Sequence, residues 1–140
     1  IIMKRILFLC TGNSCRSQMA EGWARALLGS QFEVYSAGIV AKGIDPRAVQ
    51  VMAEHDIDIS GQRSKTLVDL PPVAFDVVFT LCGDAAETCP IFSGAKVVHH
   101  GFDDPPRMAL LAADDEEALN CYRTVCIEIA DFVPTLPESC

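Results

Sequence analysis

The chain has 140 residues, half of them apolar, and a formal net charge of −8 at pH 7. This length suits one domain with its own hydrophobic core, and no apolar run approaches the roughly 20 residues that a membrane-spanning helix needs. The acidic balance argues against a nucleic-acid partner, and it means that an anion must be bound by local groups. We therefore expect a single domain over residues 1–140, with neither nucleic acid nor membrane as a partner.

Apolar runs and amphipathic segments alternate along the chain, which is typical of a parallel α/β sheet. The first run, RILFLC, is apolar almost throughout, as a strand covered on both faces should be. The pattern predicts a three-layer α/β sandwich with a four-stranded parallel sheet. The predicted strands lie at 5–10, 33–38, 75–81 and 95–100, and the predicted helices at 15–28, 46–55 and 115–132.

A tight loop follows the first strand, at the edge where open α/β sheets bind ligands. It begins at Cys10 and ends at Cys15, where the next helix starts, so its amides and the helix N-terminus form an anion site. Arg16 adds a planar guanidinium that can bind two oxygens of a tetrahedral oxyanion. The same positive field should lower the pKa of Cys10, and Ser17 should donate a hydrogen bond to its thiolate. The predicted oxyanion-binding residues are Thr11, Gly12, Asn13, Ser14, Cys15, Arg16 and Ser17.

The spacing Cys-x5-Arg-Ser after an apolar strand resembles the low-molecular-weight tyrosine phosphatase fold, which includes phosphatases and thioredoxin-coupled arsenate reductases. The resemblance covers essentially the whole chain and extends to GFDDPP at 101–106. The general acid of that family sits in an Asp-Pro pair. The resemblance therefore implies that Asp104 is the general acid here.

Two features separate the reductases of this fold from the phosphatases. The phosphatases carry aromatic residues after the Asp-Pro pair, whereas the sequence here is PRM at 106–108. They also commonly carry proline after the Arg-Ser pair, whereas this chain has Gln18. Both differences favour a reductase. The alternative is a phosphatase that hydrolyses phosphomonoesters with Cys10, Arg16 and Asp104, and a module that binds oxyanions or metals without turnover is a third interpretation.

The segment TLCGDAAETCP at 80–90 contains two further cysteines, Cys82 and Cys89. Cys82 follows the third strand, and parallel packing should bring the end of that strand close to Cys10. The residues between the two cysteines could loop or uncoil, which would let Cys89 reach Cys82. Three thiols on one route suit two-electron chemistry and serve no purpose in hydrolysis. The catalytic residues that the resemblance implies are Cys10, Cys82, Cys89, Arg16 and Asp104.

The function that the resemblance implies is the reduction of arsenate to arsenite. Cys10 attacks arsenic while Asp104 protonates the departing oxygen. Cys82 then displaces arsenite by forming a disulfide with Cys10, and Cys89 transfers the disulfide outward. A thioredoxin-type dithiol protein reduces it by thiol exchange, so we expect no tightly bound cofactor and no metal. We expect a monomer.

The sequence shows no export signal, so its seven cysteines are expected to be thiols of a cytoplasmic protein rather than a disulfide framework. Two other roles for them stay open. Cys82 and Cys89 could be packing residues. Together with His99 and His100 they also supply the ligand count of a zinc site, although adjacent histidines on a strand point to opposite faces.

Some reductases of this family bind a monovalent cation beside the loop, through residues that match Asn13, Glu21 and Ser36 and through oxygens of the segment near 63–65. That segment reads Arg-Ser-Lys in this chain. A cationic side chain from it, Arg63 or Lys65, can neutralise Glu21 in place of the metal. The sequence therefore argues against potassium dependence.

Overall fold

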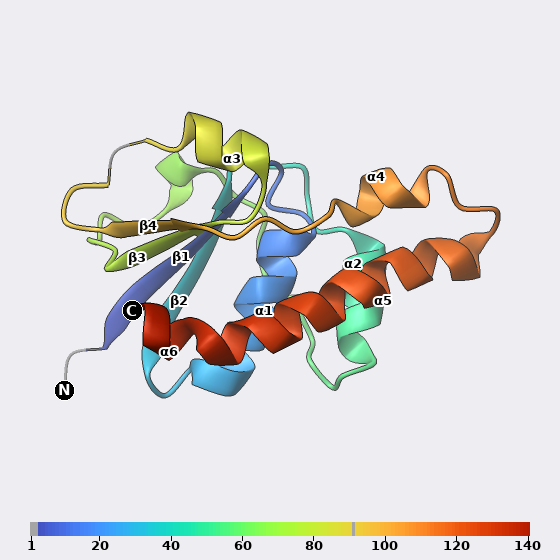
Figure 1. Ribbon diagram of the computed structural model, residues 1–140, viewed down its shortest axis with the longest axis horizontal. Coiled ribbons are helices and arrows are strands. Elements are labelled where there is room, and N and C mark those ends of the chain that lie inside the picture. The colour runs from blue at the N-terminus through green and yellow to red at the C-terminus, as the bar shows by residue number, and fades with distance from the viewer. Residues whose placement is uncertain (1–2, 91) are drawn as a thin grey trace.

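Four parallel strands form the central sheet in the order β2-β1-β3-β4 (Figure 1). The computed structural model describes residues 3–90 and 92–140. The strands are β1 (Lys4–Cys10), β2 (Phe32–Gly38), β3 (Val77–Thr80) and β4 (Lys96–His99). The predicted four-stranded parallel sheet is confirmed, with β1 at its centre.

Helices cover both faces of this sheet and give three layers (Figure 1). They are α1 (Arg16–Leu28), α2 (Pro46–Ala53), α3 (Gly83–Thr88), α4 (Pro105–Ala109), α5 (Asp115–Phe132) and α6 (Leu136–Ser139), with 3₁₀ turns at Leu67–Asp69 and Val133–Thr135. Successive β1 side chains point to opposite faces, so Ile6 and Phe8 join the core under α1 and α5. Leu7 and Leu9 join the smaller core under α3. Each face of β1 is therefore buried, as its apolar sequence predicts.

The segment between Cys82 and Cys89, which the sequence predicts could loop or uncoil, forms helix α3. Cys82 is the N-cap and Cys89 the C-cap of this helix. The backbone N–H of Ala85 donates to the Cys82 sulfur at 3.4 Å, and Ala85 itself is fully buried against the sheet. A helical rise of about 1.5 Å per residue places the two cysteines roughly 10 Å apart.

The loop after β1 packs against the end of β2, where only glycine fits. Asn13 has a φ of 46°, in the left-handed region, and this conformation brings its backbone onto Gly38. A Cβ on Gly38 would lie 2.4 Å from the carbonyl oxygen of Val40 and 2.6 Å from the nitrogen of Asn13. The pattern of strand 33–38 gave no sign of this contact. Gly38 is therefore a structural requirement of the loop.

We expect Gly38→Ala to lower the free energy of unfolding by about 1–3 kcal/mol or more, because backbone atoms on both sides leave no room for the methyl group. Gly61→Ala is the matched control, since a Cβ at Gly61 meets nothing within 4 Å. It should change stability by less than about 0.5 kcal/mol. Urea denaturation measures both. Equal midpoints for the two variants would contradict the packing described at Gly38.

Candidate active site

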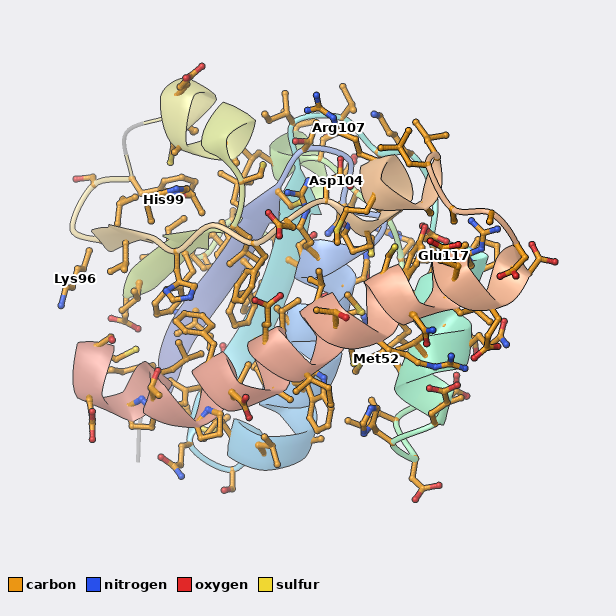
Figure 2. The ribbon with its side chains drawn as sticks, turned by 45° about the vertical axis from the view of Figure 1, so that its right-hand side comes forward. Met52, Lys96, His99, Asp104, Arg107 and Glu117 are labelled. Carbon is orange, nitrogen blue, oxygen red and sulfur yellow. The ribbon has the colours of Figure 1, made fainter. Side chains whose placement is uncertain are left out.

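The carboxyl ends of β1 and β3 open into a cavity of about 450 Å³. Its walls are formed by Cys10, Thr11, Gly12, Ser14, Cys15, Arg16, Lys42, Cys82, Gly83, Asp104, Pro106 and Arg107. Figure 2 shows Asp104 and Arg107 near each other beside α4. Four of the five predicted catalytic residues therefore line one cavity, and Cys89 does not.

The register of β1 and β3 brings Cys10 and Cys82 together. Leu9 pairs with Thr80, and the N–H of Leu81 donates to the carbonyl oxygen of Leu9 at 2.9 Å. Strands β1 and β3 therefore end at the same level of the sheet. The side chains of Cys10 and Cys82 line the same cavity, close enough for each to shift the pKa of the other.

The protonation of this pair differs from the prediction that Cys10 has the lowered pKa. The hydrogen bond with Cys82, and then burial, raise the pKa of Cys10. The hydrogen bond from Cys10 is also the largest cause that lowers the pKa of Cys82, to about 5. Cys82 has two further partners, the hydroxyl of Thr11 at 3.1 Å and the N–H of Ala85. Within this pair the surroundings of Cys82 therefore favour its thiolate. Arg16 and the backbone of Thr11 lower the pKa of Cys10, as the predicted positive field should, but by less than Cys82 and burial raise it.

Arg16 and Asp104 face each other across the cavity. Arg16 is only 8% exposed, and its guanidinium donates to the carbonyl oxygen of Phe102 at 3.1 Å. Its other terminal nitrogen lies 3.8 Å from a carboxylate oxygen of Asp104. Asp104 is the N-cap of α4, with Pro105 at the first helical position, but its side chain makes no capping hydrogen bond. The carboxyl group is 41% exposed and is left available for proton exchange.

Cys89 lies outside the cavity, at the far end of α3. Its side chain is partly buried and packs against the smaller core, and its sulfur is 3.5 Å from the carbonyl oxygen of Pro90. Burial raises the pKa of this thiol. The structure thus places Cys82 beside Cys10 and separates Cys89 from both.

Asn13 holds the loop from beneath, through a network in which Ser17 takes part. The Asn13 side chain is fully buried and donates to the hydroxyl oxygen of Ser17 at 2.8 Å. Its amide oxygen accepts from Gln18 and from the backbone N–H of Lys65, both at 2.9 Å. Among the described contacts Ser17 makes no hydrogen bond with Cys10, so the predicted support of the thiolate by Ser17 is wrong. Ser17 instead stabilises the underside of the loop.

Two cations that the motifs did not identify as anion ligands, Lys42 and Arg107, also line the cavity. Lys42 lies over the loop, and a Cβ on Gly12 would be 2.8 Å from its side chain. With Arg16, they give the cavity three basic side chains in a protein whose net charge is −8. This local excess of positive charge can attract an anion, although the net charge of the protein is negative. No pattern marks Lys42, because its position depends on how the 39–42 segment packs on the loop.

The residues of the zinc alternative are dispersed. The Nδ1 atom of His99 pairs with the hydroxyl of Thr80 at 2.9 Å, while the ring of His100 stacks on Phe132. Cys82 and Cys89 are at opposite ends of α3. Among the side chains that the structure describes, which leave out Asp84, no group of three or more His, Cys, Asp or Glu is placed to hold a metal ion. The structure therefore gives the zinc alternative no support.

Comparisons with known proteins agree with this geometry. Residues 5–102 match the family model of the low molecular weight phosphotyrosine protein phosphatases. An arsenate reductase of Bacillus subtilis is 56% identical over 137 residues, which cover 97% of this chain and 96% of that protein. A solved arsenate reductase in its phosphate-binding state has a TM-score of 0.80 and 34% identity, over 96% of both chains. A thioredoxin-dependent arsenate reductase of Corynebacterium glutamicum has a TM-score of 0.70 and 26% identity, over 98% of this chain and 61% of that one.

The chain belongs to the low molecular weight phosphotyrosine protein phosphatase family, and within it to the arsenate reductases. The predicted family, fold and enzyme class are therefore confirmed. In the part of the chain that the structure describes, none of the helices combines the length and the apolarity needed to cross a membrane.

The shared proton of Cys10 and Cys82 can be tested by ultraviolet titration of the thiolates. We expect one thiolate to form with a pKa of about 5 in the wild type. Because Cys10 is the main donor to that thiolate, Cys10→Ala should raise the pKa of Cys82 toward that of an ordinary thiol. Cys121→Ser, on the outside of α5, is the control and should leave the first titration unchanged. If no thiolate forms below pH 7 in the wild type, the assignment is wrong.

Proposed function

We propose that the chain is a cytoplasmic arsenate reductase that is regenerated by a thioredoxin-type protein, and that residues 1–140 act as a single domain and as a monomer without a tightly bound cofactor. The observation that carries the proposal is the contact between Cys10 and Cys82 in an oxyanion-binding cavity. Hydrolysis of a phosphate ester needs one thiol. Reduction of arsenate needs a second thiol within reach of the first, because two electrons must be supplied.

Arsenate would bind in the loop, where backbone N–H groups and Arg16 face its oxygens. Arg16 is held in place by Phe102 and by its proximity to Asp104, so its planar fork is positioned before the anion arrives. Lys42 and Arg107 line the same cavity and add positive charge for an anion entering from solvent.

In the first step Cys10 attacks arsenic, and Cys82 would act as its base. The thiolate of Cys82 accepts the Cys10 proton through their hydrogen bond. A sulfur–arsenic bond forms, and one arsenic–oxygen bond breaks. Asp104 gives a proton to the departing oxygen, which leaves as water. This step needs Asp104 to be protonated when the oxygen departs, and its exposed carboxyl can exchange protons with solvent.

In the second step the sulfur of Cys82 attacks the sulfur of Cys10. Its low pKa favours the thiolate that this attack requires, and the proton it had accepted passes to an arsenic oxygen. The bonding electrons of the Cys10–arsenic bond remain on arsenic, so arsenic(V) becomes arsenic(III). Arsenite leaves, and the two thiols have become a Cys10–Cys82 disulfide.

In the third step Cys89, once its proton is lost to solvent, attacks Cys82. The Cys10–Cys82 bond breaks and Cys10 leaves as a thiolate. This step requires helix α3 to open. Disulfide geometry needs Cα atoms within about 7 Å, whereas the ends of α3 are roughly 10 Å apart. The helix has only six residues, a length that is not stable in isolation. Oxidation of Cys82 also removes the hydrogen bond that its sulfur accepts from Ala85 at the start of α3. A Cys82–Cys89 disulfide would then be accessible to the reducing partner.

The test is arsenite production from arsenate with thioredoxin, thioredoxin reductase and NADPH. We expect Cys10→Ser to be inactive, because serine is not ionised at neutral pH. Cys82→Ser should form the arsenic adduct without releasing arsenite. Cys89→Ser should complete one round and then stop as a Cys10–Cys82 disulfide. The matched control is Cys121→Ser, which should turn over normally.

Hydrolysis of an aryl phosphate by the same variants separates the reductase from the phosphatase. Any such activity should need Cys10 but neither Cys82 nor Cys89. Without Cys82 the largest cause that raises the pKa of Cys10 is lost while Arg16 still lowers it, so Cys10 then needs no separate base. Full thioredoxin-coupled turnover by both Cys82→Ser and Cys89→Ser would disprove the relay and leave these cysteines as packing residues.

A further inference from the structure

Beneath the loop, on the side away from the cavity, lies a buried carboxylate that the proposed reaction does not use. Glu21 on α1 is only 4% exposed. One of its oxygens accepts a hydrogen bond from the hydroxyl of Ser36 at 2.5 Å and lies 3.7 Å from the ammonium of Lys65. The other oxygen lies 3.1 Å from Arg25, whose side chain is 57% exposed. A carboxylate this deeply buried needs a compensating charge.

The ammonium of Lys65 supplies that charge, and several oxygen atoms lie around it. This ammonium donates to the carbonyl oxygen of Arg63 at 2.8 Å and lies 3.5 Å from the hydroxyl of Ser36, besides its contact with Glu21. A carbonyl, a hydroxyl and a carboxylate are the hard oxygen ligands that a monovalent metal ion also prefers. The metal that the family resemblance implies at this place does not fit, because the ammonium of Lys65 occupies the position among these oxygens.

The sequence left open whether Arg63 or Lys65 neutralises Glu21, and the structure pairs Lys65 with it. Arg63 takes part through its backbone carbonyl, and the described ion pairs include none between its guanidinium and Glu21. The side chain of Lys65 is 15% exposed, so its charge is held close to the carboxylate rather than in solvent.

The same residues hold the catalytic loop. The backbone N–H of Lys65 donates to the amide oxygen of Asn13 at 2.9 Å. The amide nitrogen of Asn13 donates to Ser36 at 3.0 Å, and Ser36 donates to Glu21. Asn13 is the loop residue with the left-handed φ of 46°. A change of charge at Lys65 is therefore transmitted to Asn13 through one intervening hydroxyl.

We propose that Lys65 is a built-in cation that positions the oxyanion loop through Ser36 and Asn13, and that its removal uncovers a site for a monovalent metal ion formed by Glu21, Ser36 and the carbonyl oxygen of Arg63. The wild type then needs no potassium. A chain without this ammonium has the same oxygens and a buried carboxylate whose remaining ion pair is with the exposed Arg25, and it acquires a potassium response. Only the kinetic part of this proposal rests on the proposed function.

The experiment measures thermal unfolding of the wild type and of Lys65→Ala in potassium chloride and in choline chloride at equal ionic strength. The wild type should have the same midpoint in both salts. The midpoint of Lys65→Ala should be several degrees lower in choline and should rise with potassium, because the ion replaces the lost charge. Lys65→Met keeps the length of the side chain, and its midpoint should also rise with potassium. It replaces Lys65→Ala in the test if the alanine variant does not fold.

Two controls separate this role from a general effect of salt. Arg63→Ala keeps the carbonyl and should remain unresponsive to potassium, like the wild type. The double variant Glu21→Gln, Lys65→Ala lacks the carboxylate and should lose the response. A potassium-dependent midpoint in the wild type, or no potassium effect in the folded Lys65→Ala and Lys65→Met variants, would overturn the proposal.

The kinetic measurement uses arsenate reduction by the same variants. In choline, kcat of Lys65→Ala should fall by roughly tenfold to a hundredfold, because a displaced loop misaligns the reacting groups. Potassium should restore it, while kcat of the wild type should not change. If none of the proteins reduces arsenate, the proposed function fails, whereas the unfolding data still decide the role of Lys65.

Discussion

The parallel, in-register pairing of β1 with β3 is the constraint on which the rest of the site depends. It ends both strands at the same level of the sheet, so Cys10 and Cys82 leave it side by side although they are distant in sequence. Their proximity raises the pKa of Cys10 and lowers that of Cys82. A slip of one residue in either strand would turn these side chains to opposite faces of the sheet and remove the second electron donor.

Helix α3 contacts Cys82 at one end and separates it from Cys89 at the other. Its first turn supplies the N–H of Ala85 to Cys82, and its length separates Cys82 from Cys89. The helix is short, and among its described side chains Ala85 is fully buried. A change of bonding at Cys82, its N-cap, acts directly on this short element, and a local bond change there can become a movement of the chain.

The sheet and the main groups of the site could be predicted because they follow from local sequence. The apolar runs define the strands, and the spacing of Cys10 and Arg16 defines the loop. Three features could not be predicted, because each depends on contacts between distant segments. The pKa of Cys82 is lowered first by Cys10 and then by Thr11 and Ala85, which approach it from separate segments. Gly38 is required by the approach of the loop, and Lys42 reaches the cavity only because of that packing.

The central claim is that electrons pass through three cysteines in a fixed order, and it can be tested directly by one round of arsenate reduction without a reducing partner. The reaction is stopped by alkylation, and the disulfides are identified by mass spectrometry. The account predicts one equivalent of arsenite, a Cys82–Cys89 disulfide and an alkylated Cys10. One equivalent of arsenite with Cys10, Cys82 and Cys89 all alkylated would contradict it.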